Sequence, residues 1–371
     1  MSKNTFGNAL KITLFGESHG DMIGAVVDGL TPGLTVDAAV IDHQLSLRRP
    51  QGGISTSRRE KDAWQIVSGV FEGKTTGTPL CLLIPNADTH SRDYMPGIAR
   101  PGHADYTAQC KYHGYQDYRG GGHFSGRITA ALVAVGGILL PALQQRGIEI
   151  GTHIACCAGI DDVPLDAAYM GEETVLREQL RALNTQGFPV LDVAAGERMR
   201  AAIETARAEG DSVGGVLESA IVGLPAGLGE PWFDSLESQL AHALFSIPAV
   251  KGVSFGEGFA ISALRGREAN DAFRMQGERV VTETNHNGGI NGGISNGMPV
   301  TFRCAVKPTP SIYIEQPTVD YYNQKEETVV GKGRHDPCIV HRARVVVDSM
   351  SAIVVADALL QRYGNDALRA E

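Results

Sequence analysis

The sequence predicts an α/β fold, in which antiparallel sheets flanked by helices form a single-domain β-α-β sandwich. Segments with the two-residue periodicity of half-buried strands alternate with amphipathic or apolar segments of helical length. The chain has 371 residues, of which 43% are hydrophobic and 20% charged, enough for a large core. No low-complexity linker interrupts the sequence, so we assign residues 1–371 to one domain.

The N-terminal part begins with two strands, because Ile23, Ala25 and Val27 alternate with residues of the opposite face. The following helix is expected to start near Thr35 or Asp37, which are both good N-cap residues. The expected elements are strands at 11–15 and 23–30, a helix at 35–49, strands at 62–73 and 78–86, and a long apolar helix at 128–147.

The C-terminal part continues the alternation of strands and helices. Asp192 is the expected N-cap of an amphipathic helix. A later helix is expected to bury Phe233, Leu236, Leu240 and Leu244 on one face. The expected elements are a strand at 148–160, helices at 192–211 and 232–248, strands at 214–225, 250–264 and 298–308, and a closing helix at 348–364.

Neither of the common nucleotide-binding folds fits the sequence. No G-x-G-x-x-G follows an expected strand, and the chain contains no G-x-x-x-x-G-K-[ST] motif. We therefore exclude a Rossmann or P-loop fold, so a phosphate-bearing cofactor would need other backbone amides and basic side chains.

The segment FGESHG, residues 15–20, contains the G-x-S-x-G pattern of the serine hydrolase nucleophile elbow. That elbow requires a strand before the serine, a helix after it and an earlier strand-helix loop. Here the segment joins two expected strands, and only fifteen residues precede Gly16. The sequence therefore disfavours acyl-transfer chemistry at Ser18.

Charge and cysteine content limit the classes of partner and the compartment. The net charge of −9 argues against a general nucleic-acid binder, whereas Arg and His cluster in a few loops, as expected for a site that binds a small polyanion. The six cysteines show no C-x-x-C spacing and are expected to be reduced. No signal peptide is evident and no apolar stretch approaches 18 residues, so we expect a cytoplasmic protein without a membrane partner.

Three loops carry candidate functional residues. RGGGHFSGR, residues 119–127, precedes a helix and is either an anion-binding loop or a tight structural turn. KPTPSI, residues 307–312, is a weaker signal of the same kind. GRHDPC, residues 333–338, is either a salt-bridged turn or a site where Asp336 accepts a proton.

Histidine can act as a ligand, as an acid or base, or only in packing. His19 and His103 lie beside glycine in loops and remain open to a functional or a solvated interpretation, whereas His153 and His242 are expected at packing or surface positions. No H-x-x-x-H spacing occurs, so we predict no metal site.

Taken together, these loops resemble the chorismate synthase family, whose blocks occur here in the family's order between about residues 7 and 363. The blocks are FGESHG (15–20), RRP and SRRE (48–50 and 57–60), SGVFEGKTTGTPL (68–80), RPGHADYT (100–107), RGGGHFSGR (119–127), SIPAVKGVSFGEGF (246–259), GGINGGISNG (288–297), KPTPSI (307–312) and GRHDPC (333–338). Each block alone is weak, but nine in order are specific.

The resemblance implies a carbon-oxygen lyase of the shikimate pathway for aromatic amino-acid biosynthesis. The family converts 5-enolpyruvylshikimate 3-phosphate to chorismate by anti 1,4-elimination of phosphate and a ring proton. It requires reduced FMN although no net redox change occurs. A homotetramer is usual, and NADPH serves as the external reductant, either through a separate flavin reductase or in bifunctional members.

The resemblance also implies roles for individual residues. His19 would protonate the departing phosphate, His103 would control protonation at flavin N1, and Asp336 would act with flavin N5 in removing the ring proton. Ser18 and Ser125 would donate hydrogen bonds in the catalytic site. The residues implied for substrate or NADP are Arg48, Arg49, Arg58, Arg127 and Arg334. Those implied for FMN are His123, Phe124, Ser125, Pro248, Ala249, Gly292, Lys307, Pro308, Thr309, Pro310, Ser311 and Arg334.

The sequence departs from the family's usual pattern at the flavin loops. GGHFSGRIT replaces the commoner GGRSSARET, so that His123, Phe124 and Ile128 replace arginine, serine and glutamate. Pro248-Ala249 replaces a segment with one more backbone donor. Two other functions stay open at this stage: a flavin oxidoreductase that takes hydride from NADPH, and a non-catalytic module that binds a phosphosugar. For the lyase, His19 and His103 predict a turnover optimum near neutral pH.

Overall fold

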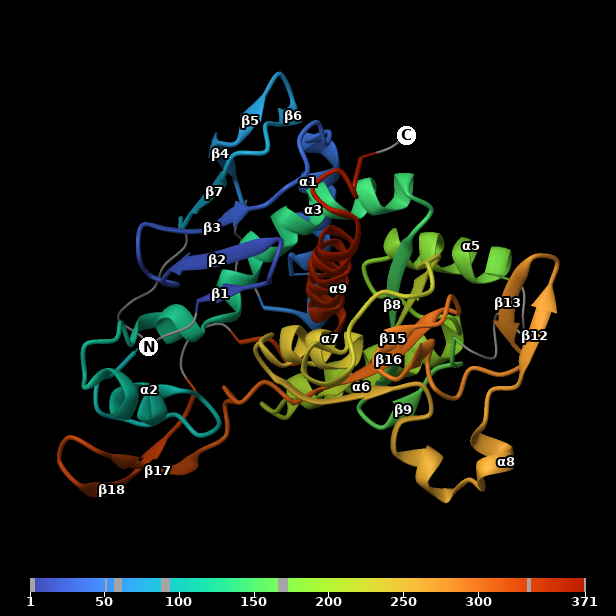
Figure 1. Cartoon of the computed structure of the whole chain (residues 1–371). Coiled ribbons are helices and arrows are strands. Elements are labelled where there is room, and N and C mark those ends of the chain that lie inside the picture. Colours follow the sequence, from blue (N-terminus) through green and yellow to red (C-terminus); the bar gives the residue numbers. More distant parts are fainter. Residues whose placement is uncertain are drawn as a thin grey trace.

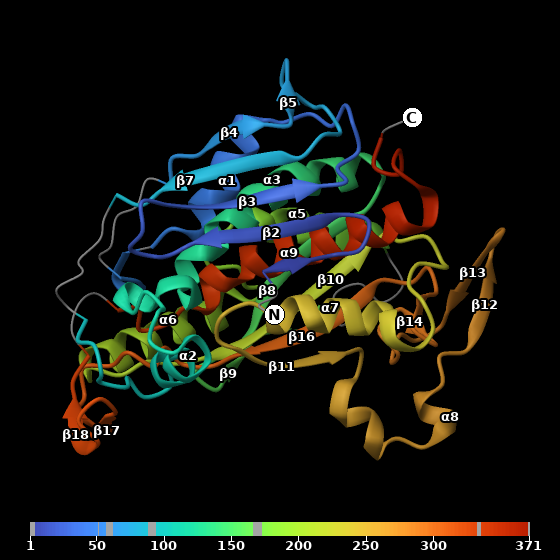
Figure 2. The same cartoon turned by 60° about the vertical axis from the view of Figure 1, so that its left-hand side comes forward.

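The computed structural model describes residues 4–50, 52–56, 62–87, 94–165, 173–331 and 335–369. Two five-stranded antiparallel sheets lie on either side of a layer of helices (Figures 1 and 2). The first sheet has the order β1-β2-β3-β7-β4, and the second has the order β11-β16-β10-β8-β9. The predicted α/β sandwich with antiparallel sheets is confirmed.

The first sheet is built from the N-terminal part of the chain. Its strands are β1 (Thr5–Phe6), β2 (Lys11–Gly16), β3 (Met22–Asp28), β7 (Leu80–Pro85) and β4 (Gln65–Ser68). Lys11 pairs with Asp28 and Gly16 with Ile23, so FGESHG is the connection between β2 and β3, as predicted. Ile23, Ala25 and Val27 are all completely buried, which confirms the predicted inward face.

The second sheet comes from the C-terminal part. Its strands are β11 (Val250–Phe255), β16 (Val300–Val306), β10 (Gly215–Val222), β8 (Glu149–Cys157) and β9 (Ile160–Asp161). Smaller hairpins pair β5 (Val70–Phe71) with β6 (Lys74–Thr75), β12 (Phe273–Gln276) with β13 (Arg279–Thr282), β14 (Ile290–Asn291) with β15 (Ile294–Ser295), and β17 (Gln316–Asp320) with β18 (Lys325–Val329).

Three helices, α1 (Ala38–Arg48), α3 (Thr129–Gln145) and α9 (Val340–Tyr363), form the central layer between the sheets (Figure 2). Helix α3 contacts strands of both sheets, and α9 packs on α3 and on the second sheet. Gly136 of α3 allows the close approach, because a Cβ atom there would lie 2.6 Å from Cβ of Ser349 in α9. The shared hydrophobic core runs through this layer.

Among the described residues, one helical segment, Gly126–Gln145, is long enough and apolar enough to span a membrane, judged by length and composition alone. The expectation that no stretch approaches this limit was therefore wrong. Within the fold, 83% of its most apolar window is buried against protein, which is the setting of a core helix.

Further helices cover the outer surfaces. They are α2 (Asp105–Tyr112), α5 (Glu173–Asn184), α6 (Val193–Ala208), α7 (Leu236–Phe245) and α8 (Gly266–Ala269), with short 3-10 turns η1 (Gly52–Ile54), η3 (Arg119–Phe124), η4 (Gly126–Ile128), η5 (Trp232–Asp234) and η6 (Gly258–Ala263). Asp37 and Asp192 are the N-caps of α1 and α6, and each carboxylate accepts the N–H two residues later, as predicted.

Several predicted boundaries were wrong for identifiable reasons. Phe233 is 91% exposed, because η5 is a separate turn and α7 begins only after its cap at Ser235. The strand expected at 250–264 ends at Phe255, since the next residue, Gly256, adopts a left-handed conformation. The closing helix begins at Val340 instead of residue 348, because its first turns bury polar residues that masked the apolar pattern.

Candidate active site

A cavity of about 1080 Å³ opens where loops from distant parts of the sequence meet at the ends of α3 and α9. Thirteen of the sequence-predicted site residues line it: Arg48, His103, His123, Phe124, Ser125, Arg127, Pro248, Ala249, Lys307, Thr309, Pro310, Ser311 and Asp336. This volume is at the upper end of the range for cofactor and substrate pockets.

Other predicted residues have a different placement. Ser18 and His19 lie behind the glycine loop, and Pro308 and Arg49 are not among the lining residues. Gly292 lies in the turn between β14 and β15 and does not line the cavity either. Arg58 and Arg334 lie outside the described residues.

The glycine loop forms the wall next to His19. Gly120, Gly121 and Gly122 have φ values of 60°, 81° and 54°, a region that glycine enters at no steric cost. A Cβ atom at Gly120 would collide with the ring of His19 and lie 3.0 Å from Oγ of Ser18. Because Gly120 lines the cavity, His19 and Ser18 lie directly behind a lining residue.

Ser18 and His19 are held in different ways. The Ser18 N–H donates to the carbonyl of Gly122 at 3.0 Å, which fixes the loop between β2 and β3 against η3. The Ser18 hydroxyl is buried and has no hydrogen-bond partner among the described residues. The His19 ring packs edge-on against Tyr94, with ring centroids 5.3 Å apart, and Tyr94 also lines the cavity. The unpartnered hydroxyl is the kind of group that a ligand satisfies.

His103 is held at both ring nitrogens. Its Nδ1 lies 3.1 Å from the carbonyl oxygen of Pro101, and its Nε2 lies 2.8 Å from Oγ of Ser311. Burial and the neighbouring Arg100 lower the pKa of His103 to about 4, so the ring is neutral at physiological pH. Arg100 itself is fixed by a bidentate ion pair with Asp105.

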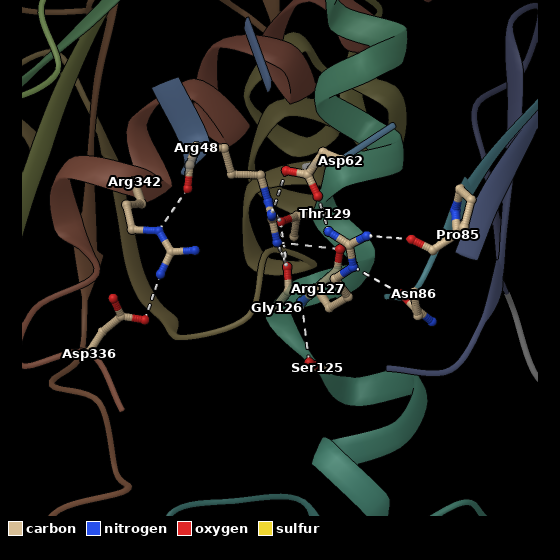
Figure 3. A network of polar contacts seen from close by, with 10 residues as sticks. All are labelled: Arg48, Asp62, Pro85, Asn86, Ser125, Gly126, Arg127, Thr129, Asp336 and Arg342. Carbon is tan, nitrogen blue, oxygen red and sulfur yellow. Dashed lines mark hydrogen bonds and ion pairs between the residues drawn. The ribbon is translucent and has the colours of Figure 1, made fainter. Parts of the chain in front are cut away.

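Asp336 lies at the start of the segment that leads into α9. Its Oδ1 accepts the N–H of Thr56 at 2.9 Å, and its Oδ2 accepts from Arg342 at 2.6 Å. Arg342 also donates to the carbonyl of Arg48 (Figure 3). The sequence left open a salt-bridged turn or a proton acceptor, and the ion pair exists while the carboxylate still lines the cavity.

Two of the arginines that line the cavity, Arg48 and Arg127, come from the end of α1 and from η4. Arg48 donates to Thr129 Oγ1 and to the carbonyl of Gly126, and Arg127 donates to Asn86 Oδ1 at 3.0 Å (Figure 3). Both arginines contact the carboxylate of Asp62, which the sequence analysis did not identify. Their side chains are mostly buried, so this arrangement is fixed by the fold.

Two residues of the segments that were expected to bind flavin also make specific contacts. His123 directs Nδ1 to the carbonyl of Gly16 at 2.8 Å, so its ring is oriented by β2. Lys307 donates to the carbonyl of Gly102 at 2.6 Å, and burial together with Lys251 lowers its pKa. Lys251 lines the cavity too, which adds a cation that the sequence motifs did not single out.

Sequence reasoning missed other lining residues. Arg342 belongs to a cluster of Arg and His in the sequence, but no motif assigned it a role. His242 was assigned to packing or the surface, and it does pack on Phe6, but it also lines the cavity. Only proximity in the fold identifies these residues.

Comparisons with known proteins agree on one family. Residues 10–360 match the chorismate synthase family. The chorismate synthase of Aeropyrum pernix is 46% identical over 365 residues, which cover 97% of this chain and 94% of that protein. The one of Thermococcus gammatolerans is 46% identical over 358 residues, covering 96% and 97%. A crystal structure of chorismate synthase is similar with a TM-score of 0.76 at 31% identity, covering 97% of this chain and 94% of that one.

Proposed function

This chain belongs to the chorismate synthase family, and from that premise we propose that it is a lyase that converts 5-enolpyruvylshikimate 3-phosphate to chorismate. The reaction would be an anti 1,4-elimination of phosphate and a ring proton, with reduced FMN and no net redox change. The observation that carries the proposal is the convergence of His103, Arg127 and Asp336 on one cavity, with His19 directly behind Gly120.

The charge of the cavity suits the substrate. The substrate carries two carboxylates and a phosphate. The basic side chains that line the cavity and can meet these charges include Arg48, Arg127, Lys251, Lys307 and Arg342. Preorganised cations that meet the developing charge on a leaving group are usually the largest catalytic contribution, with one donor worth about 3 kcal/mol.

The residues present also fit a flavin mononucleotide. The buried Ser18 hydroxyl, behind Gly120, has no hydrogen-bond partner among the described residues and can bond to a ligand. We propose that the FMN-holding residues are His123, Phe124, Ser125, Pro248, Ala249, Lys307, Thr309, Pro310 and Ser311, all of which line the cavity. When bound, reduced FMN supplies an electron-rich ring system beside the substrate.

The chain's own groups would move the protons. His19 would donate a proton to the departing phosphate, and Asp336 would accept the ring proton, with Arg342 and the Thr56 N–H fixing its orientation. His103 would hold a lone pair at Nε2 because its other nitrogen faces a carbonyl. Ser125 would orient the start of η4, because its hydroxyl accepts a hydrogen bond from the N–H of Arg127 at 3.2 Å.

The source of reduced FMN defines the second candidate function. We propose that a separate flavin reductase supplies the reduced FMN, because the sequence has no dinucleotide fingerprint for NADPH. We also propose that the enzyme is cytoplasmic. The alternative is an FMN oxidoreductase, or a bifunctional synthase with its own NADPH:FMN reductase activity. Consumption of NADPH by the pure protein and free FMN would favour that alternative. Light scattering tests the homotetramer that we also propose.

The decisive experiment is anaerobic incubation of the pure protein with 5-enolpyruvylshikimate 3-phosphate and dithionite-reduced FMN. Chorismate absorbance and released phosphate should rise together in a one-to-one ratio. His19→Ala and Asp336→Asn should lose most turnover but still bind FMN. The control His43→Ala changes an exposed residue of α1 and should keep its turnover. Phosphate release without chorismate, or no release at all, would contradict the proposal.

A further inference from the structure

Asp62 lies directly behind two of the arginines that line the cavity, Arg48 and Arg127. One carboxylate oxygen contacts Arg127, and the other lies 3.8 Å from Nη1 of Arg48 (Figure 3). Asp62 is only 4% exposed and does not line the cavity, whereas both arginines do. The arginines therefore separate the carboxylate from the space that a ligand would occupy.

We propose that Asp62 is a positioning residue that sets the guanidinium groups of Arg48 and Arg127 for an anionic group of the substrate. The inference rests on the proposed function for the identity of that anion. It goes further by assigning a role to a residue that belongs to none of the catalytic or binding motifs.

The geometry supports positioning because both arginines share Asp62 and also donate to neutral acceptors among the described residues. Arg127 donates to Asn86 Oδ1 and to the carbonyl of Pro85, and Arg48 donates to Thr129 Oγ1 and to the carbonyl of Gly126. Asp62 is the described carboxylate that both share. It links the end of α1 to η4.

The charge balance suits an anion site. The three described residues Arg48, Arg127 and Asp62 together carry a charge of +1, so they favour an anion while Asp62 reduces the repulsion between the arginines. Asp62 also costs little to keep in place, since a buried carboxylate shared by two arginines is paired on both oxygens. A competing-anion role would require Asp62 to leave this buried position when the substrate binds.

The variant Asp62→Asn tests the proposal, because the amide has the same shape but lacks the charge and turns donors toward an arginine. Calorimetry on the full-length protein should show an affinity for 5-enolpyruvylshikimate 3-phosphate about 10- to 100-fold weaker than wild type, a range expected from small misplacement of a binding group. FMN affinity should stay unchanged. Asp62→Glu, which keeps the charge, should recover part of the loss.

The matched control is Glu149→Gln. Glu149 is also buried and shared by two arginines, Arg177 and Arg181, but lies outside the cavity. It should lower the melting temperature as Asp62→Asn does, without a change in substrate affinity. Unchanged affinity in Asp62→Asn would overturn the proposal in favour of a purely structural role, and tighter binding would overturn it in favour of a competing anion.

A measurement without substrate separates this proposal from the proposed function. Arg48 and Arg127 are only 7% and 4% exposed, so phenylglyoxal should modify them slowly in wild type and Glu149→Gln. Mass-spectrometric mapping should show faster modification of both in Asp62→Asn, even if the wild type fails to bind the expected substrate. Equal modification rates in all three proteins would contradict positioning by Asp62.

Discussion

The Nε2 atom of His103 lies 2.8 Å from the Oγ atom of Ser311, a hydroxyl that can either donate or accept a hydrogen bond. On the other side of the ring, Nδ1 faces the carbonyl oxygen of Pro101 at 3.1 Å. A carbonyl oxygen only accepts, so Nδ1 carries the hydrogen and Nε2 of the neutral ring accepts from the Ser311 hydroxyl. His103 therefore presents a lone pair, not a proton, toward residues 307–311.

This arrangement predicts that His103 titrates near pH 4 in the folded protein, because burial and Arg100 both disfavour its charged form. Unfolded histidine binds a proton near pH 6.5, so the stability contributed by neutral His103 is complete above that pH and falls as the pH drops toward 4. An NMR titration of His103 in the FMN-free protein measures the midpoint directly. A midpoint above pH 6 would contradict the assigned environment.

The same value changes the expected pH dependence of turnover. From the sequence we expected protonation of His103 to lower activity on the acid side of neutrality. With a pKa of about 4, His103 stays neutral throughout the range from pH 5 to 9. An acid limb near pH 6 would therefore report a different group, and it should persist unchanged in Ser311→Ala.

Gly120→Ala should abolish most turnover, because the added Cβ atom would collide with the His19 ring and lie 3.0 Å from Oγ of Ser18. If His19 is displaced from the cavity wall, we expect kcat to fall about 100-fold, the cost of misplacing a catalytic group by about 1 Å. Anaerobic turnover with reduced FMN provides the measurement.

A glycine outside the cavity serves as the control for this substitution. Gly33 has a φ of 87°, so Gly33→Ala brings a similar backbone strain of about 1 kcal/mol, but its Cβ atom meets no atom within 4 Å. It should retain most activity. Similar losses in both variants would show that backbone strain, not displacement of His19, controls the rate.

Local patterns predicted the elements whose residues interact with near neighbours in sequence. The alternation at Ile23, Ala25 and Val27 and the caps Asp37 and Asp192 depend on contacts within a few residues, and all are confirmed. Phe233 was misassigned because the helical spacing of leucines extends into η5, where Trp232 has a φ of 70°.

Long-range pairing could not be predicted in the same way. The start of α9 contains buried Arg344 and Asp348, which form an ion pair, and Asp348 also accepts a hydrogen bond from Thr152 of β8. In the sequence, such charged residues are typical of a solvent-exposed segment. Asp62 contacts Arg127, 65 residues later, so no local spacing reveals it. Most of the site residues that the family motifs indicated line one cavity in the fold, but Gly292 lies in the turn between β14 and β15.

His153 ties β8 to β10 and to the start of α6. It is fully buried, with Nδ1 3.0 Å from Asp162 and Nε2 2.9 Å from Glu218. Asp162 in turn accepts the N–H groups of Leu191 and Asp192. His153→Gln leaves two buried carboxylates without their shared cation, so we expect a loss of about 3–5 kcal/mol in the free energy of unfolding.

The pH dependence of that loss has a defined sign. Burial lowers the pKa of His153, but the hydrogen bonds to Asp162 and Glu218 outweigh it and raise the net value. Its stabilisation is therefore complete below about pH 6.5 and declines as the pH rises through the raised pKa. Denaturant unfolding at pH 6 and pH 9 should show a larger difference from wild type at pH 6. A smaller difference at pH 6 than at pH 9 would refute a charged His153.

The packing of α3 on α9 gives a last prediction, on stability alone. In Gly136→Ala the new Cβ atom would lie 2.6 Å from Cβ and 3.0 Å from Cα of Ser349, and backbone of a central helix has little freedom to move away. Overpacking of this kind costs about 1–3 kcal/mol, which outweighs the gain of up to about 1 kcal/mol in helix propensity. Gly266→Ala in α8 meets nothing within 4 Å and should be neutral or stabilising. Denaturant midpoints of both variants measure the difference, and a Gly136→Ala protein as stable as wild type would show that the two helices are not in this close contact.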